Sequence, residues 1–216
     1  MAALFPKRSN TVFRLLLALM VLTPPAAFVA LMVYVRTPWN TDQYVRVDQP
    51  VEFDHRHHVV DDEIECLYCH RDAETSANAG IPATDVCMGC HAQVWNESPL
   101  LEPVRRSYFA NRPIPWNRVH NLADFAYFNH AVHVQRGIGC VQCHGRVDQM
   151  ARIEKVESLQ MRWCLECHRH PDRYPGNAAV QAASYDVFWG TPPRPADEVK
   201  TVRAITSLTT CTACHR

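Results

Sequence analysis

The sequence predicts a mainly irregular and α-helical protein with little regular secondary structure, preceded by one N-terminal transmembrane helix. Three observations support this fold class. The chain has 15 prolines against 7 glycines, which suits loops and short helices. An uncharged stretch runs from Leu15 to Val35, and all ten cysteines fall in one short motif that occurs five times.

The repeated motif is Cys-x-x-Cys-His, the attachment site of haem c. Its two thiols add to the haem vinyl groups, and the histidine that follows binds the iron. Zinc sites and disulfides also pair cysteines, but neither requires that histidine. We therefore expect five covalently bound haems c. The motifs are Cys66, Cys69 and His70; Cys87, Cys90 and His91; Cys140, Cys143 and His144; Cys164, Cys167 and His168; Cys211, Cys214 and His215.

The haems are expected to form the core of the protein. When residues 37–216 are shared among five haems, only a short length of chain is left for each. A peptide of that length buries too little apolar surface to fold alone. We therefore expect a haem-cored multihaem cytochrome c with little or no sheet. The balance of 22 basic and 22 acidic residues gives no sign of nucleic-acid binding.

The N-terminal segment is expected to anchor the protein in a membrane. The uncharged run from Leu15 to Val35 would form a helix about 31 Å long, close to the thickness of a bilayer core. Lys7, Arg8 and Arg14 favour an inside N-terminus. The alternative is a cleaved signal peptide with Leu15–Thr23 as its apolar core, since Pro24-Pro25 splits the run. No small-x-small cleavage site follows, so we expect a single-pass anchor over residues 1–36 in a bacterial inner membrane.

The remaining residues, 37–216, are expected to form one periplasmic domain that contains an internal repeat. Phe53, His55 and His58 recur as Phe128, His130 and His133, and all three are displaced by the same distance along the chain. Two attachment motifs follow each copy. The repeat therefore predicts two modules, at about 51–91 and 126–168, with the fifth attachment site appended at 211–215.

The repeated histidines are candidates for the second axial ligand of iron. Residues i and i+3 share a helical face, so His55/His58 and His130/His133 can each reach two different haems. The fifth distal ligand stays open between Met150, His120 and Met161. His57 is expected at the surface, His170 follows His168 too closely to reach another iron easily, and Met88 is expected to pack in the interior.

These features resemble the pentahaem cytochrome c subunit of bacterial alternative complex III. The similarity rests on the anchor, the five motifs, the two Phe-x-His-x-x-His runs, and the runs 118–122 (RVHNL) and 159–169 (LQMRWCLECHR). It covers about residues 50–170 and the last motif. The Phe-x-His-x-x-His pattern alone is shared with small class III multihaem cytochromes and is less specific.

The resemblance implies an electron-transfer subunit of a quinol-oxidising respiratory or photosynthetic membrane complex. Its partners would be an iron–sulfur subunit, polytopic quinol-site subunits and another cytochrome c. The electron acceptor would be a cytochrome, a cupredoxin or a terminal oxidase. No substrate site of its own is expected.

Two other functions are compatible with parts of the sequence. A stand-alone, membrane-anchored multihaem quinol dehydrogenase would share the anchor and the motifs. A reductase of nitrite or a similar oxyanion would need one open iron. The surplus of histidine and methionine ligands, and the lack of a Cys-x-x-Cys-Lys variant, favour fully coordinated haems.

Overall fold

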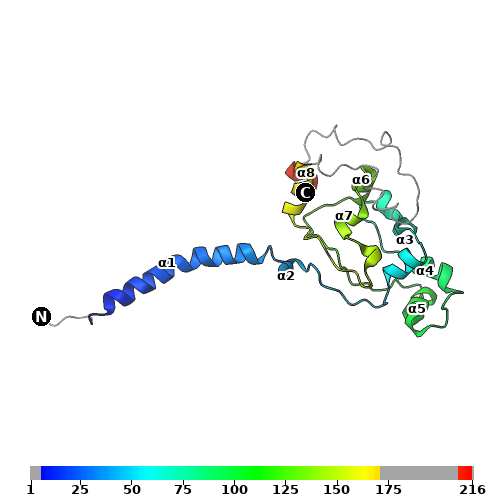
Figure 1. The fold of residues 1–216 in the computed structure, drawn as a ribbon, viewed down its shortest axis with the longest axis horizontal. Helices are drawn as coiled ribbons and strands as arrows, with labels where there is room; N and C mark the ends of the chain where they lie inside the picture. The colour runs from blue at the N-terminus through cyan, green and yellow to red at the C-terminus, as the bar shows by residue number, and fades with distance from the viewer. Residues whose placement is uncertain (1–5, 171–208, 216) are drawn as a thin grey trace. The chain divides into compact units, whose positions relative to one another are not determined.

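The computed structural model describes residues 6–170 and 209–215 (Figure 1). The chain divides into two compact units, Met1–Gln43 and Tyr44–Arg216. In the first unit, helix α1 spans Ser9–Tyr34 and the short helix α2 spans Pro38–Thr41.

Helix α1 is 26 residues long and is continuous through Pro24 and Pro25. None of its residues is buried, and its length and composition suit a membrane span. Figure 1 shows the helix changing direction partway along, as expected for a proline pair that removes backbone hydrogen bonds. The helix begins before the predicted span, and Arg14 lies in its second turn.

The second unit consists of short helices joined by loops. The predicted absence of sheet is confirmed for residues 44–170 and 209–215, where only two isolated bridges occur, Arg46 with Glu154 and Ala126 with His215. The helical elements are a π-helix η1 (His57–Asp61), α3 (Cys66–Cys69), the 3-10 helix η2 (Arg71–Glu74), α4 (Thr84–His91), the 3-10 helix η3 (Pro99–Leu101), α5 (Glu102–Ala110), α6 (His130–Gln135), α7 (Cys140–His144), the 3-10 helix η4 (Val147–Gln149), α8 (Met161–Arg169) and α10 (Cys211–Cys214).

Helix α5 lies in the connector between the two modules, where the sequence patterns specified no helix. A proline in its first turn favours the helix start, and Asn111 ends it in the left-handed conformation, with φ of 49°. The Ser107 hydroxyl lies 2.7 Å from that of Thr84 on α4. Val104 of α5 is 3% exposed, so the connector contributes a packed helix beside the second attachment motif.

The side-chain core of the described residues is small. One cluster joins Val51, Met88, Val104 and Ile114, which confirms that Met88 packs in the interior. No large side chain in the described part of the chain is fully buried. Protein interiors are normally close-packed around such side chains. The fold therefore relies on something other than its own side chains to fill its centre.

Candidate haem-attachment sites

Each attachment motif is held on a helical turn. Helices α3, α7 and α10 begin at the first cysteine of their motifs, and α4 and α8 carry theirs in later turns. In every case the residue before the helix is extended. On a helix, cysteines at i and i+3 lie on one side, so both thiols can meet one edge of a macrocycle. None of the ten cysteines forms a disulfide.

The two Phe-x-His-x-x-His segments have the same local geometry. The Phe53 ring meets His55 edge-on at 4.7 Å and stacks on His58 at 4.2 Å. Phe128 meets His130 at 4.8 Å and His133 at 4.4 Å in the same two orientations. Each phenylalanine therefore holds two imidazoles at a fixed angle to each other, and the sequence repeat is also a structural repeat.

Backbone carbonyls orient many of the imidazoles through Nδ1. His58 Nδ1 pairs with the Asp54 carbonyl at 3.0 Å, and His133 Nδ1 pairs with the Asn129 carbonyl at 2.8 Å. The same pairing occurs at His70 with Gly80, His91 with Val94, His130 with Ala77 and His215 with Phe125. Metal-binding histidines typically donate one ring N–H to such a carbonyl, which leaves Nε2 for the metal.

Three distal candidates face a motif histidine at the separation that one intervening metal ion requires. A metal–imidazole bond is about 2 Å long, which puts the centroids of two trans imidazoles about 6 Å apart. The centroid distance is 6.1 Å for His58 and His91, and 6.1 Å for His133 and His168. His130 and His144 are 6.4 Å apart. The first two pairs occupy corresponding places in the two modules.

His55 corresponds to His130 in the repeat and lies near His70. Burial lowers the pKa of His55 to about 4, and His70 lowers it further by electrostatic repulsion. Its Nδ1 atom is buried and makes no hydrogen bond. Burial also lowers the pKa of His144 to about 3. Both rings are therefore neutral at physiological pH, which is the form that binds metal.

His120 lies beside the third motif. Its ring centroid is 4.4 Å from that of His144, which is shorter than the trans separation, and its Nε2 atom is buried without a hydrogen-bond partner. Burial lowers the pKa of His120 to about 4. A neutral imidazole with a buried, unpaired nitrogen is a suitable metal ligand, so His120 stays among the candidates.

The other candidates occupy different surroundings. Met150 is half-buried, and its methyl group approaches Gly145, directly after His144. Met161 begins α8 and is 60% exposed. His57 is exposed and lies 3.2 Å from Asp61 and 3.5 Å from Asp62, which confirms its predicted surface position. His170 is half-buried at the end of α8.

These residues fit covalently attached haem. The side-chain core is too sparse for a domain of this size, two buried histidine nitrogens lack partners, and three imidazole pairs stand at the trans separation. Within the described parts of the chain, no three His, Cys, Asp or Glu side chains converge into a metal centre of their own. The donor set therefore matches axial ligands of porphyrin iron better than a zinc site.

Gly145, directly after His144, has a backbone conformation that is nearly restricted to glycine, with φ of 70° and ψ of −165°. A Cβ atom there would lie 2.8 Å from Cγ2 of Val156. We expect Gly145→Ala to lower the free energy of unfolding by about 1–3 kcal/mol and to reduce haem loading at His144. Denaturant unfolding followed by haem absorbance measures this.

Gly89→Ala provides the matched control, because a Cβ atom at Gly89 has nothing within 4 Å. The corresponding position in the fifth motif is already an alanine, Ala213. We expect this control to change the free energy of unfolding by less than about 1 kcal/mol. Equal losses in the two variants would contradict a special role for Gly145.

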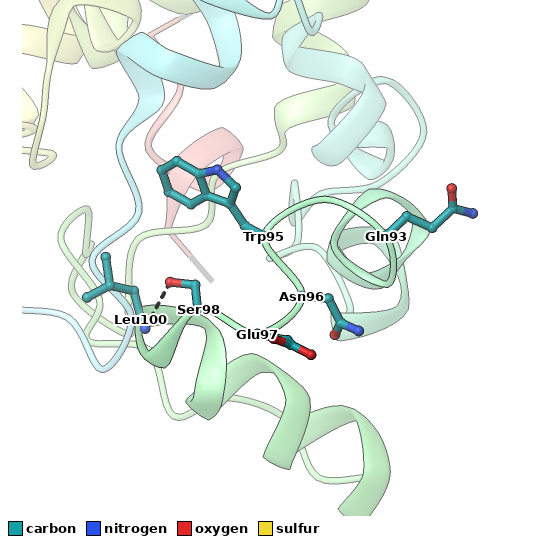
Figure 2. Close-up of a pocket in the computed structure, with 6 residues that line it drawn as sticks. All are labelled: Gln93, Trp95, Asn96, Glu97, Ser98 and Leu100. Carbon is teal, nitrogen blue, oxygen red and sulfur yellow. Dashed lines mark hydrogen bonds between the residues drawn. The ribbon is translucent and has the colours of Figure 1, made fainter.

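Two hollows lie beside the second motif and share Trp95. Figure 2 shows the larger one, about 640 Å³ in volume, with Trp95 and Leu100 pointing to one side of the loop and Gln93 and Asn96 to the other. The second hollow, of about 540 Å³, is lined in part by His58 and by the acidic side chains of Glu52, Asp54 and Asp61. This end of the domain therefore opens to solvent near the His58–His91 pair.

Sequence reasoning found the paired histidines and the phenylalanine of each repeat, but not what holds the imidazoles in place. The rings of Phe53 and Phe128 and the carbonyls of Asp54 and Asn129 fix them. The constant offset of the repeat could have indicated Asp54 and Asn129, because it relates these two positions as well.

Comparison with known proteins also supports haem attachment. Residues 126–216, which contain the second module and the fifth motif, match the family described as cytochrome c7 and related cytochrome c. The chain is also 33% identical over 102 residues to the multihaem cytochrome c subunit of menaquinone reductase from Nitratidesulfovibrio vulgaris strain Hildenborough. That match covers 47% of this chain and 48% of the relative. The chain therefore spans about half the length of the relative it matches.

Proposed function

We propose that this multihaem cytochrome c binds five haems and serves as the electron-transfer subunit of a quinol-oxidising membrane complex of the alternative complex III type. One observation carries the proposal. Imidazoles from the two repeated segments stand opposite motif histidines at 6.1–6.4 Å, the separation suited to iron with two axial ligands. If these histidine pairs hold the haem irons, both axial positions would be filled, which would suit electron exchange and leave no place for a substrate.

The haem supplies one-electron exchange at its iron, and the chain holds and tunes it. We assign His58 to the site of His91, His130 to that of His144, and His133 to that of His168. The repeat assigns His55 to His70. Backbone carbonyls at Nδ1 orient most of these rings and raise their basicity as ligands.

The fifth site, at His215, needs a distal ligand from the remaining candidates. The candidates are His120, Met150 and Met161. Alternatively, one of them binds at the site of His144, and His130 serves the fifth site instead. A thioether ligand would raise the potential of its haem above that of sites with two histidines. The protein would then hold one haem at a higher potential than the others.

Helix α1 is proposed as the membrane anchor, with residues 37–216 in the periplasm. We expect a protein that lacks residues 1–36, exported by a cleavable signal, to move almost completely from the membrane fraction to the soluble fraction with its haems attached. Fractionation with haem staining measures this. An unrelated single-span helix fused in place of residues 1–36 should restore membrane binding. Retention of the truncated protein in membranes of a host without partner subunits would place the anchor elsewhere.

The partners follow from the same proposal. The matched relative is by its name a subunit of a menaquinone reductase, which supports a quinone-linked membrane complex for this chain. We propose an iron–sulfur subunit, polytopic quinol-site subunits and a further cytochrome c as neighbours. Electrons would leave towards a cytochrome, a cupredoxin or an oxidase.

Purification in mild detergent from the native membrane tests the function. We expect five haems per chain by the pyridine haemochrome assay, no titratable thiol, and co-purifying iron–sulfur and polytopic subunits by mass spectrometry. Quinol oxidation should require those subunits. If the purified chain alone oxidised a quinol analogue, it would be a stand-alone quinol dehydrogenase. Four or fewer haems, or a reactive thiol, would contradict the five-haem assignment.

A further inference from the structure

We infer that the five attachment motifs are ordered in space as second, first, third, fourth, fifth, so that the two repeat modules meet through their first motifs. This inference rests on the proposed loading of all five motifs. The proposed spatial order differs from the order of the motifs in the sequence by one exchange, that of the first and second motifs. The first motif lies between the second and the third, and the second motif forms an end of the row.

The junction between the modules lies at the first and third motifs. The side chains of Cys66 and Cys140, which belong to different modules, lie next to each other. Each cysteine is the first of its motif and would be bonded to a porphyrin edge. Two porphyrins attached there must be close neighbours.

Backbone contacts fix the same junction independently of the thiols. Helix α6 packs beside η2, the turn that follows His70. The backbone N–H groups of His130 and Ala131 donate to the carbonyls of Ala77 and Ser76, at 3.2 and 3.0 Å. Gln135 Nε2 donates to the Glu74 carbonyl at 2.9 Å. The helix that presents the distal histidines of the second module is therefore bound to the loop after the first motif.

Within each module the two motifs are neighbours. The ring of Phe53 contacts both His55 and His58, and His58 faces His91 of the second motif. In the other module, α6 presents His130 to His144 and His133 to His168, so the third and fourth motifs flank one helix. The side chain of Cys143 in the third motif also lies near those of Cys164 and Cys167 in the fourth.

The fifth motif lies next to the fourth. Tyr127 N–H donates to the Cys214 carbonyl at 2.8 Å, and Ala126 forms an antiparallel bridge with His215. These residues lead directly into Phe128, which stacks on His133. The side chain of Cys214 also lies near that of Cys164 in the fourth motif. We therefore place the fifth motif next to the fourth, at the end of the second module.

The consequence is a row with the second and fifth motifs at its ends. The modules are related head to head, because each turns its first motif towards the other. The solvent-open hollow lined by His58 and Trp95 lies at the second-motif end. Electrons from a redox partner that binds at this end would have to pass the first motif before they reach the third.

Electron paramagnetic resonance of the purified, oxidised holoprotein tests this order. The measurement counts how many low-spin iron signals change their relaxation when one iron is altered. Removal of a distal histidine makes one iron high-spin, and its dipolar effect on other irons falls steeply with distance. The proposed order predicts that His58→Ala changes the relaxation of one remaining low-spin signal. His55→Ala should change two, because the first motif has neighbours on both sides.

A nitroxide on Trp95→Cys identifies which iron has become high-spin. Trp95 is 62% exposed and follows Val94, whose carbonyl pairs with His91 Nδ1 at 3.1 Å. The nitroxide should therefore respond strongly to His58→Ala and weakly to His55→Ala. The engineered cysteine would be the sole free thiol when all ten natural cysteines are bonded to haem.

The opposite count would overturn the inference. If the spatial order followed the sequence, the iron at the second motif would affect two signals and the iron at the first motif only one. If a variant loses its haem instead, the same numbers of altered signals are expected, because removal of an oxidised iron also changes the relaxation of its neighbours. A wrong count would leave the subunit composition and haem content of the purified complex unaffected, so it would reject the order without rejecting the proposed function.

Discussion

Replacement of His133 by alanine is expected to convert one iron completely from low-spin to high-spin while its haem stays attached. The thioether bonds proposed at Cys164 and Cys167 would not depend on the distal imidazole. His133 faces His168 at 6.1 Å and is fixed by the Asn129 carbonyl and the Phe128 ring. Because no other imidazole of the described residues is held in that place, the sixth coordination position should be left open. Absorption and paramagnetic resonance spectra of the oxidised protein measure the change.

Two controls separate a ligand from a residue that only supports the fold. His57→Ala should leave every iron low-spin, because His57 is exposed and bound to Asp61 and Asp62. Free imidazole added to the His133→Ala protein should enter the space left by the side chain and restore the low-spin spectrum. An unchanged spectrum in His133→Ala would remove this residue from the ligand set.

Removal of the third attachment site is expected to have the largest effect on folding. In a protein with Cys140→Ala and Cys143→Ala, the haem at the junction of the modules cannot be bonded. Few buried side chains of the described residues are available in its place, and cofactor binding is coupled to folding in domains of this kind. We expect the amount of holoprotein in the membrane fraction to fall by at least about tenfold, since about 1–2 kcal/mol already changes abundance several-fold.

The fifth motif supplies the matched comparison. Cys211→Ala with Cys214→Ala removes the same kind of site at the end of the row. We expect this protein to accumulate within about twofold of the unchanged protein, with one haem fewer, because in the proposed order the fifth motif has one neighbouring motif and the third has two. Quantitative haem staining and immunoblotting measure both variants. Equal losses would show that all sites contribute alike and that the third has no central place.

The sequence by itself determined the chemistry and the broad architecture. The Cys-x-x-Cys-His motif specifies covalent haem because the thiols and the histidine must be adjacent in the chain, so the site is local. The constant offset that relates His55 to His130 and His58 to His133 identified candidates for the distal ligands. The surplus of prolines over glycines correctly predicted short helices and loops. The uncharged run correctly predicted a long apolar helix, because both properties depend on composition and spacing alone.

Only the tertiary structure decided which residues meet across the chain. The facing pairs of His58 with His91 and of His133 with His168 join separate segments of the chain, and no local spacing specifies them. The same is true of the hydrogen bonds from His130 and Ala131 to the carbonyls of Ala77 and Ser76, which support the proposed place of the first motif beside the third. Helix α5 was also missed, because its amphipathic face gains stability from packing on α4 and Met88 rather than from propensity. Long-range packing sets these contacts, and it depends on which surfaces the folded chain brings together.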